Sequence, residues 1–129
     1  MSNRRRAARR NTYRTGYLRS RQWFARRDRW FQDQQRTAHP LRCVGCGRVS
    51  NKRHLELHHV SYDGVLQLDG RWRAAEADND LWPMHPACHE LLHRVIDRDP
   101  VLSRHRTREA ASRYALRIVR ERFSPKEAS

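Results

Sequence analysis

The densest grouping of metal-binding side chains in this sequence lies between Asp80 and His93. Within nine positions the chain carries His85, Cys88, His89 and His93. His85 and Cys88 are separated by two residues, which is the spacing of one half of a zinc knuckle. His89 and His93 are four residues apart, so their side chains share one face of a helix. The segment therefore predicts ligands for two separate metal centres, and the rest of the chain must supply the remaining ligands.

A second pair of ligands lies upstream, at Cys43-x-x-Cys46. Two thiolates at this spacing can hold one tetrahedral zinc ion from a tight turn, and Gly45 and Gly47 permit the backbone of such a turn. A redox-active pair would need a strand before the motif and a helix after it. Pro40 upstream and a strand-like run downstream argue against that alternative.

Combining this pair with His85 and Cys88 predicts a closed, structural Cys3His zinc site. The alternative is that His85 is an ordinary exposed histidine and the fourth ligand lies elsewhere. The size of the chain favours a structural metal. It has 129 residues, of which 37% are hydrophobic, enough for one domain with a thin core.

The net charge of +14 predicts a polyanionic partner, and nucleic acid is the simplest one. The only lysines are Lys52 and Lys126, and arginine forms forked contacts with phosphate. Codon bias in a GC-rich genome is an alternative source of the arginines. No basic amphipathic helix with a strong apolar face indicates a membrane surface. Four arginines are candidate nucleic-acid contacts: Arg42, Arg71, Arg73 and Arg94.

The expected domain organisation is a disordered basic arm over 1–16, a folded domain over 17–123 and a flexible tail over 124–129. A helix is expected over 17–35, with Ser20 as its N-cap. Its aromatic rows are expected to pack in the core: Tyr17, Phe24 and Phe31, and Trp23 and Trp30. The last helix is expected over 103–123, with outward-facing arginines that include Arg108. Its buried stripe is expected to be Ala111, Tyr114, Ala115, Ile118 and Phe123.

Between these helices, the residues 54–60 alternate between polar and apolar, which predicts a strand with His58 and His59 on opposite faces. Turn signals at 63–64 and 69–70 flank a short strand over 65–68. A second short strand at 81–82 leads into a helix that has Pro86 in its first turn and carries Cys88 to about Ile96.

His89 and His93 on the helix, with one of His58 and His59 on the neighbouring strand, can provide three ligands. Three protein ligands leave open positions, as in a catalytic metal site. One of the two adjacent strand histidines would then be free to act as a general base, because neutral imidazole can accept a proton from water.

The whole pattern resembles the HNH endonucleases, the ββα-metal or His-Me finger nucleases, in their small bacterial or phage form with a zinc knuckle. The resemblance covers about Tyr17 to His93. Its motifs are Cys43-x-x-Cys46, Leu57-His-His-Val60, Asp80-Leu81 and His85-x-x-Cys88-His-x-x-x-His93. It implies an α+β fold, in which a ββα-metal core with a Cys3His zinc knuckle is flanked by an N-terminal and a C-terminal helix.

Carried over by position, the resemblance makes His59 the general base and Asp80 the counterpart of the middle Asn of the family. It makes His58, His89 and His93 the ligands of one catalytic divalent ion, such as Mg²⁺ or Mn²⁺, beside the structural Zn²⁺. Two departures are visible. Asp80 replaces Asn, and ionised Asp only accepts hydrogen bonds. His85 replaces a knuckle cysteine, which zinc tolerates.

The activity implied is hydrolysis of DNA phosphodiester bonds to 5′-phosphate and 3′-hydroxyl ends, by nicking or double-strand cutting. RNA is a second possible substrate. The alternatives are a catalytically weak or inactive zinc module that binds nucleic acid, and a nuclease accessory to phage packaging or restriction machinery. Without a transmembrane run or an apolar signal core, we expect a cytoplasmic protein in a bacterial or phage-infected cell. The sequence does not indicate a dimer interface, and a monomer is favoured.

Overall fold

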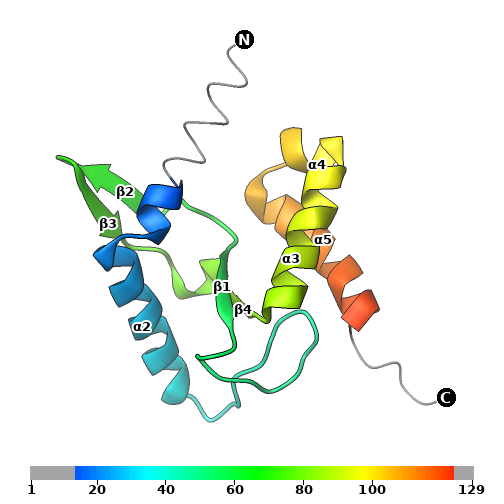
Figure 1. Ribbon diagram of the computed structural model, residues 1–129, viewed down its shortest axis with the longest axis horizontal. Helices are drawn as coiled ribbons and strands as arrows, with labels where there is room; N and C mark the ends of the chain where they lie inside the picture. The colour runs from blue at the N-terminus through cyan, green and yellow to red at the C-terminus, as the bar shows by residue number, and fades with distance from the viewer. Residues whose placement is uncertain (1–13, 124–129) are drawn as a thin grey trace.

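An antiparallel pair of strands and the helix that follows it form the centre of the molecule. The computed structural model describes residues 14–123. In it, β1 (Glu56–His59) pairs with β4 (Leu81–Met84), with Glu56 opposite Met84 and His59 opposite Leu81. Helix α3 (Pro86–Arg98) follows β4 directly and lies beside the pair (Figure 1). The predicted α+β class is confirmed.

The N-terminal part of the described chain is helical on both sides of Ser20. Residues 14–18 are helical, so the predicted basic arm does not extend to residue 16, and its residues 1–13 lie outside the described part. Helix α2 (Arg21–Gln35) then begins at Ser20, whose hydroxyl accepts a hydrogen bond from Trp23 N at 3.1 Å. This is the predicted N-cap. The predicted tail, 124–129, also lies outside the described residues.

The buried face of α2 differs in one position from the expected aromatic rows. Trp23, Trp30 and Phe31 are buried, whereas Phe24 is 54% exposed. Phe24 and Phe31 are seven residues apart and point in nearly the same direction, so the difference lies in what covers each position and not in the rotation of the helix. The buried face instead contains Arg26, whose guanidinium donates to the carbonyl of Glu76.

A second antiparallel pair lies within the connection from β1 to β4. The strand predicted over 65–68 is present as β2 (Val65–Leu68), and it pairs with β3 (Arg71–Ala74). Asp69 and Gly70 join them with φ values of 51° and 73°, as a two-residue hairpin turn of the primed type requires. β3 packs against α2. The short helix η1 (Asp78–Asp80) then leads into β4.

The predicted helix 103–123 is two helices. α4 (Pro100–Arg104) is capped by the Asp99 carboxylate, which accepts from Val101 N at 2.9 Å. α5 (Arg108–Phe123) is preceded by Thr107, whose hydroxyl accepts from Ala110 N at 3.1 Å. Local capping by these side chains therefore separates the two helices around residues 105–107.

The buried stripe of α5 is also shifted from the predicted one. Ala111 and Ala115 are buried as expected, but Tyr114 and Ile118 are 51% and 37% exposed. The observed stripe consists of Ala111, Ser112, Ala115, Leu116 and Val119. The small side chains let α5 pack closely against α3, so the large residues Tyr114 and Ile118 remain on the outer side.

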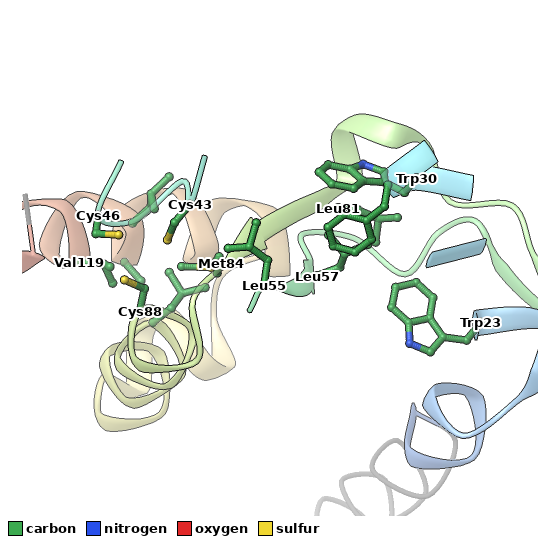
Figure 2. Packing of buried hydrophobic residues seen from close by; sticks show 14 of the residues in the cluster. Trp23, Trp30, Cys43, Cys46, Leu55, Leu57, Leu81, Met84, Cys88 and Val119 are labelled. Carbon is green, nitrogen blue, oxygen red and sulfur yellow. The ribbon is translucent and has the colours of Figure 1, made fainter. Parts of the chain in front are cut away.

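The core runs without interruption from the aromatic residues of α2 to the cysteines. Figure 2 shows Trp23 and Trp30 at one end, leucines of the central strands in the middle, and Met84 and Val119 beside the sulfur atoms. The cysteines of the predicted zinc knuckle are thus part of the packed interior. In the described part of the chain, no helix has the length and apolar character that crossing a membrane requires.

Candidate metal centres

The structure brings together the four residues predicted for the zinc knuckle. The ligand atoms of Cys43, Cys46, His85 and Cys88 all lie within 4.8 Å of one another. His85 Nδ1 is 3.2 Å from Cys46 Sγ, and the backbone N–H of His85 donates to Cys43 Sγ at 3.3 Å. His85 is therefore part of the cluster, and the four side chains could hold a zinc ion.

Glycine is required in the turn between the first two cysteines. A Cβ atom on Gly45 would lie 2.9 Å from both Cys88 Cβ and Val119 Cγ1, which is closer than packed carbon atoms approach. Gly47 has a φ of +76° and donates its N–H to the carbonyl of Cys43 at 2.9 Å. A side chain at Gly45 would displace its neighbours, and one at Gly47 would strain the backbone, so glycine suits both positions of the turn.

The charge of the cysteine cluster fits a bound cation. Burial raises the pKa of Cys43, but the backbone N–H groups of His85, Cys46 and Gly45 outweigh it and lower this pKa overall. Burial, together with the neighbouring Cys43 and Cys46, raises the pKa of Cys88 to about 12. A bound zinc ion would supply the positive charge that lets all three sulfur atoms be thiolates at once.

A second cluster is formed by the three histidines predicted to bind the other ion, here called the triad: His58, His89 and His93. His58 Nδ1 lies 3.2 Å from His89 Nε2, and His93 Nε2 lies 3.0 Å from the same atom. Nitrogen atoms that bind one tetrahedral ion at about 2.1 Å are about 3.4 Å apart. The separations therefore suit shared ligation of one ion, and the cluster can hold a metal.

Other side chains fix the orientation of two triad rings. Nε2 of His58 lies 2.9 Å from the hydroxyl of Ser112, on α5. Nδ1 of His89 lies 3.4 Å from a carboxylate oxygen of Glu56, on β1. In both rings the nitrogen that faces the other histidines is thus the one left for a metal, as in sites where an outer residue orients the ligand.

The triad is held in the neutral form that metal binding requires. Burial, then the charge of Arg108, lowers the pKa of His58 far below its usual value. Burial and the neighbouring His89 lower the pKa of His93 to about 4. Burial also lowers the pKa of His89, although Glu56 acts in the opposite direction. The three rings therefore retain their lone pairs at neutral pH.

His59 faces the other side of β1, as the strand alternation predicted. Its Nε2 lies 2.7 Å from Oε2 of Glu76, and the hydroxyl of Tyr17 donates to the same oxygen at 2.7 Å. Burial raises the pKa of Glu76, but the hydrogen bonds from His59 and Tyr17 lower it overall, so the carboxylate is ionised. An ionised carboxylate only accepts hydrogen bonds, so Nε2 of His59 carries the proton and Nδ1 has the lone pair.

His59 lines a cavity of about 370 Å³ together with two members of the triad, His89 and His93. Tyr62 lies in it, stacked on His59 with ring centroids 4.2 Å apart. Its lining residues are Arg14, Thr15, Leu18, Leu57, His59, Tyr62, His89, His93, Asp97 and Arg108. A wider groove of about 500 Å³ includes Arg27 and His85 but no member of the triad. The smaller cavity is therefore the one of the two that brings His59 together with triad residues.

Asp80, the predicted counterpart of the family's middle Asn, contacts the end of β1 through its backbone. Its carbonyl accepts a hydrogen bond from Val60 N at 2.8 Å, one residue after His59. Within residues 14–123 its carboxylate makes no hydrogen bond or ion pair, and it does not line the cavity. Asp80 can therefore brace the strand end, but the structure does not bring its side chain to the histidines.

The predicted nucleic-acid arginines are exposed and lie away from the cavity lining: Arg42, Arg71, Arg73 and Arg94. Arg42 donates to the carbonyl of Gly47, and Arg94 pairs with Glu90. Arg108, in contrast, was expected to point outward. This expectation was wrong, because its Nε donates to the carbonyl of His59 at 2.6 Å and it lines the cavity.

Comparison of the chain with protein-family models, curated proteins and solved structures gives no match.

Proposed function

We propose that this protein is a metal-dependent endonuclease of the HNH type, which hydrolyses DNA phosphodiester bonds. The observation that carries the proposal is the pairing of two features at one cavity. The triad provides three neutral nitrogen ligands, and His59 provides an oriented base. A structural role alone does not require four buried or half-buried histidines at adjoining positions.

The order of the elements supports the same proposal. In a ββα-metal nuclease two antiparallel strands precede a helix that carries metal ligands. Here β1 carries His58 and His59, β4 pairs with β1, and α3 carries His89 and His93. The Cys3His cluster holds the start of α3, so the first triad ligand on this helix follows directly after the last cysteine, Cys88.

The residues divide the chemistry between them. A divalent ion on the triad would supply Lewis-acid stabilisation of the charge that develops on the phosphate and the leaving 3′-oxygen. His59 accepts the proton of the attacking water at Nδ1, while Glu76 holds Nε2–H and stabilises the imidazolium that results. Arginines on the surface hold the DNA backbone through phosphate contacts, so weak sequence preference is expected.

A zinc-containing module that binds nucleic acid without cutting it is the rival function. The observation in its favour is that the carboxylate of Asp80 has no partner among the described residues, where the family uses Asn. The net charge of +14 is compatible with both functions. A module that only binds nucleic acid does not explain why His59 lies beside the triad.

Nicking of supercoiled plasmid with Mg²⁺, Mn²⁺ or EDTA tests the proposal. The wild-type protein should nick with a divalent ion and not with EDTA. His59→Ala should lose at least about 100-fold in rate, because a general base contributes about that factor. His54→Ala is the matched control, since His54 is exposed on the same segment and should stay within about twofold of wild type.

Nicking by His59→Ala at the wild-type rate would remove His59 from the mechanism. Plasmid binding without nicking under every metal, with or without a packaging or restriction partner, would favour the rival module.

A further inference from the structure

Arg108 lines the same cavity as His59, His89 and His93. It is at the start of α5, and its Nε donates to the carbonyl of His59. Its charge acts on the rings of all four site histidines, His58, His59, His89 and His93. Residues 14–123 contain no salt-bridge partner for it, so its remaining guanidinium N–H groups are available to a ligand in the cavity.

A second guanidinium contacts the same aromatic ring as Arg108. Arg14 and Arg108 have their guanidinium carbons 4.7 and 4.9 Å from the centroid of the Tyr62 ring. Tyr62 in turn stacks on His59, so both arginines are held beside the base. Asp97 is the only acidic residue among those that line the cavity. Burial and the charge of Arg14 both lower the pKa of Arg108, which reflects repulsion between the two cations.

This arrangement is unfavourable for metal binding by itself. A cation next to the triad repels a divalent ion, and two neighbouring guanidinium groups repel each other. All three positive charges are stabilised at once when an anion lies between them. An oxyanion with several acceptor atoms can contact the ion and both arginine forks.

We propose that Arg108 and Arg14 form a phosphodiester-binding site, which holds the nucleic-acid phosphate between their guanidinium groups and the ion on the triad. The proposal rests on the proposed function and identifies the residues that hold the reacting phosphate. Neither arginine belongs to the exposed set predicted to contact nucleic acid.

The site has a signature that a structural role for Arg108 would not produce. Removal of its charge weakens binding of a phosphodiester and strengthens binding of the metal in the absence of DNA. The metal and the phosphodiester therefore bind cooperatively in the wild-type protein, and each increases the affinity for the other by the same factor.

The test measures both affinities in Arg108→Gln and in Arg117→Gln. Arg117 is exposed on the same helix, so the control removes the same charge away from the cavity. Binding of Mn²⁺ is followed by its electron paramagnetic resonance signal. Binding of a short DNA duplex, with Mn²⁺ present, is followed by fluorescence anisotropy in a His59→Ala background that prevents cleavage.

Arg108→Gln should bind the duplex about tenfold or more weakly, because charged hydrogen bonds to phosphate are lost. It should bind Mn²⁺ about threefold more tightly. Arg117→Gln should change both affinities by less than about twofold. Equal behaviour of the two variants, or a loss of Mn²⁺ affinity in Arg108→Gln, overturns the proposal. The cleavage assay is separate: opposite shifts in a protein that does not nick would retain this site while the nuclease function fails.

If Arg108→Gln does not fold, a titration of the wild-type protein decides. The probe is thymidylyl-(3′→5′)-thymidine, which carries one phosphodiester. A shift of the Arg108 Nε–H resonance that saturates with the dinucleotide supports the site, and an unchanged resonance at saturating probe overturns it.

Discussion

The hydroxyl of Ser112 lies 2.9 Å from Nε2 of His58, although 54 residues separate them in the sequence. Both side chains are buried, with Ser112 0% and His58 1% exposed. The last helix of the described chain therefore orients a residue of the triad. Of the two ring nitrogens of His58, this contact leaves Nδ1 directed at His89 and His93.

Ser112→Ala should reduce the affinity of the triad for Mn²⁺ by about tenfold, the usual consequence of losing an outer hydrogen bond to a ligand. The buried Nε2 of His58 then has no partner, and the ring can rotate away from the other ligands. Mn²⁺ titration by electron paramagnetic resonance measures the change. Ser103→Ala, at an exposed position of α4, should leave the affinity unaltered. Equal affinities in the two variants would mean that Ser112 does not position His58.

Glu76→Gln should lower the rate of plasmid nicking by about 100-fold while Mn²⁺ affinity stays within about twofold. The neutral amide no longer stabilises an imidazolium on His59, and Glu76 does not contact the triad. Tyr17→Phe should have a smaller effect, because it removes one donor from the carboxylate and leaves the contact with His59. If Tyr17→Phe and Glu76→Gln lose the same activity, the effect comes from packing in this region and not from the carboxylate.

Cys43→Ser should lower the zinc content to below one ion per chain and reduce the melting temperature by about 10 °C or more. The cysteine cluster forms one end of the interior that Figure 2 shows, so its loss loosens that end of the core. Metal analysis and circular dichroism measure the two effects together. An unchanged melting temperature in a zinc-free variant would exclude a structural role for the ion.

The triad should make stability depend on pH. The pKa of His93 is about 4 in the folded protein, which is below the value of about 6.5 for an unfolded chain. Between these values the unfolded chain binds more protons, so the free energy of unfolding falls as the pH is lowered from about 6.5 to 4. The effect is absent above about pH 6.5, where neither state binds the proton.

Urea denaturation at pH 7 and pH 5, without added Mg²⁺ or Mn²⁺, measures this dependence. His93→Gln should lose less stability than the wild-type protein between the two pH values, because it lacks one of the groups that take up protons on unfolding. Loss of zinc at the lower pH affects both proteins and does not produce this difference. Identical losses would show that His93 titrates in the same way in both states.

Local sequence spacing was sufficient for the ligand clusters. Cys43-x-x-Cys46 and His85-x-x-Cys88 each place two candidate ligands three positions apart in the chain. The four-residue spacing of His89 and His93 places both side chains on one face of a helix. Strand alternation likewise separated His58 from His59. These features depend on neighbours in the chain, so the sequence determines them directly.

The partners of these ligands could not be predicted in the same way. Glu76 belongs to no motif, and its contact with His59 depends on how the β2–β3 hairpin folds against α2. Arg108 and Ser112 were misassigned or missed because their roles depend on the rotation of α5 about its axis. The apolar pattern of this helix permitted two stripes, and the packing of small residues against α3 selected one of them.

The position of α5 in the chain also sets an order of events during synthesis. All four site histidines leave the ribosome before Arg108 and Ser112 do, because synthesis proceeds from the N-terminus. Until those two residues are made, Nε2 of His58 has no hydroxyl beside it and the cavity has no Arg108. The cavity becomes complete only after α5 has folded back onto α3. A chain that ends before Arg108 would therefore carry all four histidines without the residues that orient and surround them.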